Sequence, residues 1–187
     1  MRSNNLDRLQ LAGAAALMAL TALVALLAGG SALHAQAAAK LDDPTIVAIF
    51  DAANTWDIET GKLAETRGSD KAVKDFGAML VRDHTNVRQQ ERDLASKLKV
   101  TPTPPKKFAL AKAHADAMKK LRGLSGKAFD KAFLQNEVDY HQAVIDAVTS
   151  TLLPSLQNQE VKDLVTKVAP AFAAHRDAAK NMLAKGE

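Results

Sequence analysis

Apolar residues recur at steps of three and four along four long stretches of the chain, which is the spacing of helices that bury one face. The four stretches are residues 43–67, 70–97, 127–153 and 159–185. In the third stretch two polar residues, Glu137 and His141, stand one turn apart inside the apolar stripe. The pattern predicts an all-helical chain in which one helix carries polar side chains toward the core.

The residues between these stretches predict how the helices end and connect. We expect Asp43 to cap the first helix. Gly68 is expected to end that helix in the left-handed conformation, and Ser69 to cap the second. The third helix is expected to end before Pro154, and Pro170 is expected to kink the fourth. The connection between the first and second helices and that between the third and fourth are both short, so each of these two pairs is expected to form an antiparallel hairpin.

A long crossover joins the two expected hairpins. Its first part, residues 101–105, contains three prolines and is expected to be extended. Residues 106–122 are expected to form a shorter helix that is rich in alanine. The sequence thus predicts a ferritin-like antiparallel four-helix bundle, with a short extra helix in its long crossover. A looser all-helical arrangement is the alternative.

The first 37 residues have the features of a secretory signal peptide. Leu11–Leu27 is an uncharged apolar run, and Ala35 and Ala37 are the small residues that signal peptidase recognises. Cleavage would leave one domain over residues 38–187, located in the periplasm of a Gram-negative bacterium. The alternative is an uncleaved leader that anchors the domain to the membrane.

Composition narrows the range of functions. Aromatic residues make up only 4% of the chain, which suits closely packed helices rather than a β-sandwich. The chain has no cysteine, which excludes disulfides, thiol catalysis and thiolate metal sites. No phosphate-binding glycine loop, nucleophile elbow or His-Glu-x-x-His motif occurs, so we expect a protein that is not an enzyme.

Histidines and carboxylates stand near the midpoints of the expected long helices, on or next to their apolar stripes. The candidate ligands are Glu59, His84, Glu137, His141 and His175. Because helices that start and stop together place their midpoints at one height, we expect these side chains to meet in the core. They can bind a transition metal, for which imidazole and carboxylate are good ligands. Alternatively, they form a structural network in which each carboxylate holds an imidazolium.

On the first helix, Asp57 and Glu59 both stand near the midpoint. We take Glu59 as the ligand because it follows Trp56 and precedes Leu63 in the apolar stripe. The same stripe predicts that Trp56 is buried beside the candidate ligands. His114 belongs to the crossover helix, among alanines and lysines, and is expected to be exposed.

Several short motifs follow one another at characteristic spacings. They are Glu59 with Gly61–Ala64, Phe76 with Met79–His84, Ser125–Asp130 with Val138 and His141, and Pro170 with His175. Over residues 43–183 their order resembles an exported, ferritin-like helical-bundle family of unknown function, whose members are often labelled predicted outer membrane proteins. The resemblance implies a helical bundle and an exported location, and no established activity.

The candidate ligands differ from those of diiron ferritins. Such proteins carry a glutamate three residues before the ligand histidine on two helices, whereas these positions here are Val81, Val138 and Phe172. Glu137 instead precedes His141 by four residues. If a metal binds, a histidine-rich site for Cu(II), Ni(II) or Zn(II) fits better than a carboxylate-rich iron pair.

The crossover is strongly basic. Its lysines and arginine up to the end of the expected helix are Lys106, Lys107, Lys112, Lys119, Lys120 and Arg122, against one acid, Asp116. Such a face can dock on anionic lipid head groups, and an envelope-associated interaction protein that binds no metal is the alternative function. A solvated surface helix explains the same charges more simply. Nucleic acid is not an expected partner, because no aromatic residues alternate with the basic ones.

Overall fold

The computed structural model describes residues 41–106 and 109–186, so the expected leader at residues 1–37 lies outside the described residues. The helices are α2 (Asp43–Arg67), α3 (Lys71–Leu98), α4 (Ala109–Arg122), α5 (Gly126–Ala147), α6 (Leu153–Ser155) and α7 (Gln159–Lys185), with a π-helical turn at Val148–Leu152. No strand occurs among the described residues, and the predicted all-helical fold is confirmed. None of these helices is both long enough and apolar enough to cross a membrane.

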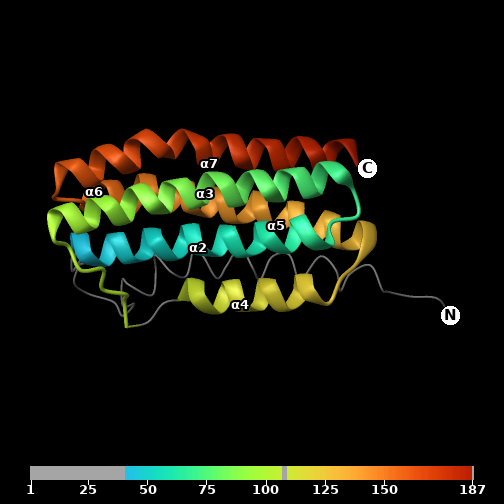
Figure 1. Ribbon diagram of the computed structural model, residues 1–187, viewed down its shortest axis with the longest axis horizontal. Coiled ribbons are helices and arrows are strands. Elements are labelled where there is room, and N and C mark those ends of the chain that lie inside the picture. The colour runs from blue at the N-terminus through green and yellow to red at the C-terminus, as the bar shows by residue number, and fades with distance from the viewer. Residues whose placement is uncertain (1–40, 107–108, 187) are drawn as a thin grey trace, which may run out of the picture.

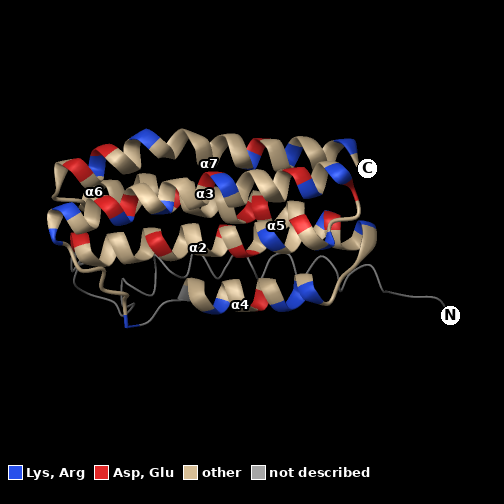
Figure 2. Cartoon of the chain, viewed as in Figure 1, with Lys and Arg blue, Asp and Glu red and all other residues tan. Residues whose placement is uncertain are grey.

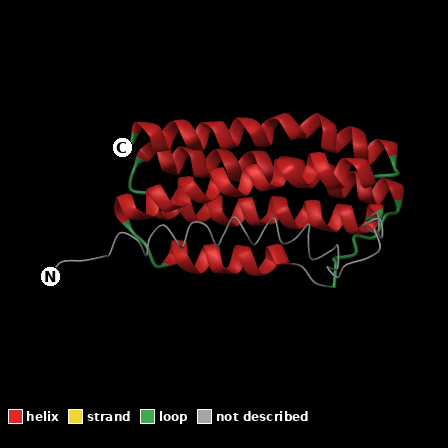
Figure 3. Cartoon of the chain, turned by 180° about the vertical axis from the view of Figure 1, so that it is seen from behind, coloured by secondary structure: helices red, strands yellow, loops and turns green. Residues whose placement is uncertain are grey.

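The long helices α2, α3, α5 and α7 lie side by side in a bundle, and α4 lies along its outside (Figure 1). Helices α2 and α3 form one antiparallel hairpin, and α5 and α7 form the other. Helix α4 carries the chain back along the bundle, so α5 begins at the end where α2 stops and runs in the same direction as α3. The view from behind shows the same arrangement (Figure 3).

Helices α2 and α3 approach each other closely because each has a glycine at their contact. A Cβ atom on Gly77 would lie 2.6 Å from the carbonyl oxygen of Gly61, and one on Gly61 would lie 2.8 Å from the carbonyl oxygen of Gly77. A larger residue at either position would therefore push the two helices apart. Gly61 lies one turn after Asp57 on α2, so this contact determines the spacing of the hairpin close to its midpoint.

Two carboxylates bind the hairpins to each other, one at each end of the bundle. Asp130 of α5 accepts hydrogen bonds from the backbone N–H groups of residues 69 and 70, at 2.8 and 2.9 Å, and from the hydroxyl of Ser69. Asp43 of α2 accepts from the backbone N–H groups of residues 157 and 158, each at 2.8 Å. Each hairpin thus holds the turn of the other, which fixes their relative height.

These two contacts correct the expected helix caps. Asp42 caps α2, because its side chain accepts from the N–H of Thr45 at 2.9 Å, while Asp43 points to the other hairpin. Asp70 caps α3, because Ser69 is engaged by Asp130. The prediction of a left-handed Gly68 is also wrong, since its φ is −51°.

The third expected helix has a different end. Helix α5 stops at Ala147 and continues as the π-helical turn into α6, so the helical path includes Pro154 instead of ending before it. Pro154 lies in α6 directly after the π-helical turn at Val148–Leu152. Helix α7 runs through Pro170.

Two apolar clusters fill the bundle, one toward each end. The first includes Phe50, Val148 and Val165, and the second includes Phe76, Phe129 and Phe133. Between the clusters, buried polar side chains come from all four long helices. We call this set the polar layer, and it comprises Asp57, His84, Glu137, His141 and His175.

A further carboxyl group, Glu91, is buried inside the first apolar cluster. Neither of its oxygens has a hydrogen-bond partner, and it borders a small cavity lined otherwise by apolar side chains such as Phe50 and Val165. Burial, and then the negative charge of Asp51, raise the pKa of Glu91 to about 9. At neutral pH this carboxyl is therefore protonated and uncharged.

Replacing Glu91 by glutamine should remove one pH dependence of stability. The pKa of this carboxyl rises from 4.5 to about 9 on folding, so the folded state binds a proton that the unfolded state releases. Its stabilising contribution is complete below pH 4.5 and is lost as the pH rises toward 9. We expect the free energy of unfolding in urea to fall less over this range in Glu91→Gln than in the wild type. The exposed control Glu65→Gln should follow the wild type, and equal slopes for all three proteins would contradict a neutral Glu91.

Candidate metal centre

Three imidazoles from three helices meet in the polar layer. His84 comes from α3, His141 from α5 and His175 from α7, and all three are buried. Their ring centroids lie 5.6 Å apart for His84 and His141, 5.1 Å for His84 and His175, and 5.3 Å for His141 and His175. Each ring offers a nitrogen that lies within 4.8 Å of a nitrogen of the other two. Three nitrogens grouped in this way could hold one metal ion.

The orientation of His84 is set by Asn54. The Nδ1 atom of His84 lies 2.9 Å from the side-chain oxygen of Asn54. The amide nitrogen of Asn54 donates to the carbonyl oxygen of Phe50 at 2.9 Å, so its oxygen faces the ring as an acceptor. Nδ1 of His84 therefore carries the proton, and Nε2 keeps a free lone pair.

The other two rings are oriented in the same manner. Nδ1 of His141 donates to the backbone carbonyl of Glu137 at 2.9 Å, which leaves the lone pair on Nε2. Nε2 of His175 donates to the carboxylate of Asp83 at 3.2 Å, which leaves the lone pair on Nδ1. Histidines that bind metals in proteins typically donate their second ring N–H to a carbonyl or a carboxylate in this way.

The nitrogens that carry the three lone pairs lack hydrogen-bond partners. They are His84 Nε2, His141 Nε2 and His175 Nδ1, and each of these atoms is buried. They cannot satisfy one another, because all three are acceptors. A buried acceptor without a partner costs about 1–3 kcal/mol. Imidazole nitrogens with free lone pairs are good ligands for a transition metal.

Two carboxyl groups of the polar layer lie next to the rings. The Oδ2 atom of Asp57 is 3.5 Å from Nε2 of His84 and 4.0 Å from Nε2 of His141. The Oε2 atom of Glu137 is 3.5 Å from Nδ1 of His141. Asp57, Glu137 and His141 form a second group whose ligand atoms lie within 4.8 Å of one another. Asp57 is thus placed to add an oxygen ligand to the three nitrogens.

Burial keeps the imidazoles neutral and favours protonation of the carboxyls. Desolvation, with the neighbouring histidines second, lowers the pKa of His84 well below its usual range and that of His141 to about 3. Desolvation, and then the charge of Glu137, raises the pKa of Asp57 well above its usual range. Desolvation also raises the pKa of Glu137 to about 7. Neutral imidazole is the form that binds a metal.

The polar layer does not satisfy itself, as a structural network would. In such a network each carboxylate would hold an imidazolium, but burial disfavours both charged forms. One oxygen of Asp57 and one of Glu137 lack hydrogen-bond partners, like the three ring nitrogens. These five atoms are where the polar layer departs from a closed hydrogen-bonded network.

Four of the five predicted ligands meet in the polar layer, and Glu59 does not. The side chain of Glu59 is 48% exposed, and its Oε2 lies 2.7 Å from Nε2 of His114 on α4. Asp57 lies in the polar layer in its stead. Residues two apart on a helix are rotated by about 200°, so Asp57 and Glu59 lie on nearly opposite faces of α2. A sequence signal for Asp57 existed, since it stands one turn from the buried residues Ala53 and Gly61.

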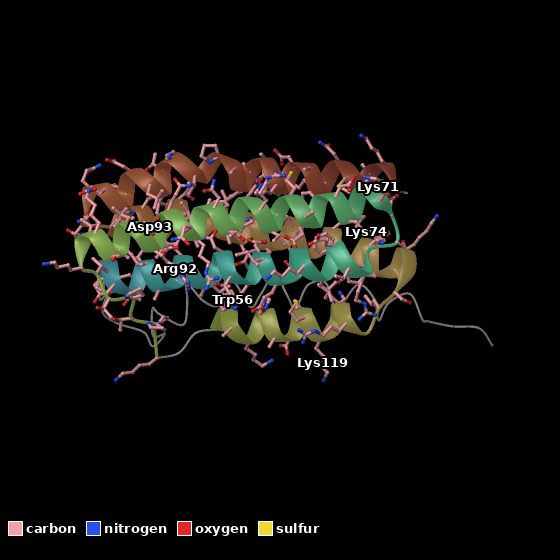
Figure 4. All side chains as sticks on the ribbon, viewed as in Figure 1. Trp56, Lys71, Lys74, Arg92, Asp93 and Lys119 are labelled. Carbon is pink, nitrogen blue, oxygen red and sulfur yellow. The ribbon has the colours of Figure 1, made fainter. Side chains whose placement is uncertain are left out.

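Trp56 and His114 also differ from expectation. The ring of His114 stacks on that of Trp56, with centroids 5.4 Å apart and planes 16° apart. Only 11% of the His114 side chain is exposed, so its predicted exposure is wrong. Trp56 is half-buried and lies between α2 and α4, away from the interior of the bundle (Figure 4). These two rings join the crossover helix to the bundle.

Sequence reasoning missed Asn54 and Asp83. Both act through hydrogen bonds between helices, to His84 and His175 respectively. Asp83 and His84 are neighbours in the sequence but face different partners, since successive residues on a helix diverge by about 100°. Pairing across helices depends on which faces pack together, and sequence spacing alone does not contain that information.

The basic residues of the crossover that the structure describes are exposed to solvent. Those that the structure describes and shows as exposed are Lys106, Lys112, Lys119, Lys120 and Arg122. Figure 2 shows these charges along α4 and at its end, and Figure 4 shows Lys119 pointing away from the bundle. Lys112 pairs with Asp116 at 2.6 Å. Docking of this face on an anionic surface stays a prediction.

The comparisons with known proteins identify a family and no closer relative. A family model described as "Domain of unknown function (DUF4142)" matches residues 28–182, which is most of the chain. No curated protein and no solved structure gives a match.

Proposed function

The chain belongs to the DUF4142 family, whose description assigns no activity, and we propose that it binds one divalent transition-metal ion in the polar layer. The observation that carries this proposal is the convergence of three buried imidazoles, each of which has one nitrogen without a hydrogen-bond partner. Each ring is held by a hydrogen bond on its other nitrogen, so the three lone pairs are oriented before an ion arrives. Such preparation lowers the cost of ordering the ligands on binding.

The ligand set indicates the kind of metal. Three neutral imidazoles and the carboxylate of Asp57 suit Zn(II), Cu(II) or Ni(II), and the chain has no thiolate to offer. Glu137 lies next to Nδ1 of His141, the nitrogen that carries the proton, and its backbone carbonyl accepts the hydrogen bond that orients the ring. A carboxylate-bridged iron pair is a poorer fit, because the layer supplies only two carboxyl groups.

The connectivity supports placing the bundle in the ferritin-like class. Two antiparallel hairpins joined by one long crossover, with α3 and α5 parallel, are the arrangement of ferritin-like bundles. In that class metal sites lie in the bundle core and draw side chains from all four helices. The polar layer also lies in the bundle core and also draws its side chains from all four long helices, with histidines in place of most carboxylates.

Metal-free wild-type protein without a histidine tag should bind one equivalent of Zn(II) in calorimetric titration. Free Zn(II) at about 100 times its Kd should raise the free energy of unfolding by about 2.7 kcal/mol. His84→Ala, His141→Ala and His175→Ala should each lose most of this binding and stabilisation. Asn54→Ala should weaken binding by about 10–100-fold, because His84 loses its orienting partner.

His114→Ala is the matched control, since this histidine lies outside the polar layer. It should bind Zn(II) like the wild type. Absence of binding by the wild type, or equal losses in all four histidine variants, would contradict the proposed site. In that case the structural network would remain, with each core substitution lowering the stability of metal-free protein by about 1–3 kcal/mol.

The second part of the proposal concerns location. Residues 1–37 act as an export signal and are removed, so that the domain works in the periplasm; the uncharged run Leu11–Leu27 supports this view. The intact mass of protein isolated from its native envelope fraction should correspond to a chain that begins near Ala38. A full-length mass in the membrane fraction would contradict cleavage and favour an anchored domain.

A further inference from the structure

We infer that the exposed carboxylate of Asp83 attracts the metal ion from solvent to the interface between α3 and α7, beside His175. The inference rests on the proposed metal binding and adds the route by which the ion reaches the polar layer. It starts from the hydrogen bond between Nε2 of His175 and Oδ2 of Asp83, 3.2 Å long. Through this contact, one ring connects a group at the surface to the buried imidazoles.

The exposure of the two partners changes steeply across this contact. The side chain of Asp83 is 35% exposed, whereas that of His175 is 7% exposed. The other members of the polar layer, Asp57, His84, Glu137 and His141, are more deeply buried. Of the groups that contact the layer's histidines, the Asp83 carboxylate is therefore the one that an ion in water meets first.

The opposite side of the bundle offers less access. Helix α4 packs against both α2 and α5 and so covers the interface between them. Its Met118 and Leu121 are buried there, and its His114 stacks on Trp56. Helix α4 lies on the other side of α2 from α7 in both views (Figures 1 and 3), so it does not cover the α3–α7 interface.

The carboxylate of Asp83 can exchange its present partner, Arg82, for an incoming cation. Its Oδ1 atom pairs with Nε of Arg82 at 2.9 Å, and the Arg82 side chain is mostly exposed. An exposed pair of this kind contributes only about 0–1 kcal/mol. A divalent cation can displace the guanidinium from Oδ1 and pair with the carboxylate there. Oδ2 keeps the hydrogen bond that Nε2 of His175 donates. Arg82 therefore slows uptake, because its guanidinium competes with the incoming ion for the Asp83 carboxylate.

The predicted result is a change in the rate of uptake. Asp83→Asn keeps an oxygen that accepts from His175 but loses the negative charge. We expect the association rate constant for Co(II), followed by stopped-flow absorption of its d–d bands, to fall about tenfold at low salt. The difference should shrink as salt is added, because screening weakens the attraction. Arg82→Gln should change the rate in the opposite direction and speed uptake.

Asp177→Asn is the matched control. Asp177 forms the same kind of pair with its preceding arginine, Arg176, at 2.8 Å, and lies on α7 close to His175 in sequence. Among the described residues, its carboxylate pairs with Arg176 and with none of the imidazoles. Its substitution removes the same charge, and uptake should stay within about twofold of the wild type. An equal slowing in Asp177→Asn would show that net charge alone is responsible and would overturn the role of Asp83.

The outcome also separates this inference from the proposed function. If Asp83 only holds His175 in place, Asp83→Asn would change the dissociation rate and leave the association rate as in the wild type, and the capture role would be wrong. If the wild-type protein gives no Co(II) spectrum, the metal site itself fails, along with any route to it. A normal spectrum with a slower appearance in Asp83→Asn supports both.

Discussion

The histidines of the two hairpins can meet only if the hairpins keep one offset along the bundle, and two carboxylates provide this constraint. Asp130 holds the turn before α3, and Asp43 holds the turn before α7. A slip of one helical turn, about 5.4 Å, would move His141 and His175 away from His84. The geometry of the centre thus depends on backbone hydrogen bonds at both ends of the molecule.

The fold tolerates a buried polar layer because the regions around it are well packed. The clusters around Phe50 and around Phe133 supply the hydrophobic stabilisation, while Gly61 and Gly77 let α2 and α3 approach closely. With that support, the fold tolerates five buried atoms of the layer without hydrogen-bond partners. Groups held in this way raise the energy of the metal-free protein, and an ion that pairs with them recovers part of it. On the proposed account, stability and metal binding are therefore linked through the same atoms.

The helices and the height of the histidines were predictable from sequence, because both follow from helical periodicity and from equal helix lengths. His84, His141 and His175 are each at the correct level. The choice of Glu59 over Asp57 was wrong because a wide apolar stripe does not distinguish a residue facing the core from one facing α4. Partners across helices, such as Asp83 for His175, depend on packing that periodicity does not specify. The prediction of the helix caps was wrong for a related reason, since Asp43 and Asp130 bind turns that are distant from them in the sequence.

The central claim is that three imidazoles share one ion, and X-ray absorption at the zinc edge of the loaded wild-type protein tests it directly. Imidazole rings scatter in a characteristic way that simple oxygen ligands lack. The account predicts three imidazoles with Zn–N distances of about 2.0–2.1 Å and one carboxylate oxygen. A first shell of oxygens with one imidazole or none would contradict it, because such an ion would lie outside the layer formed by His84, His141 and His175.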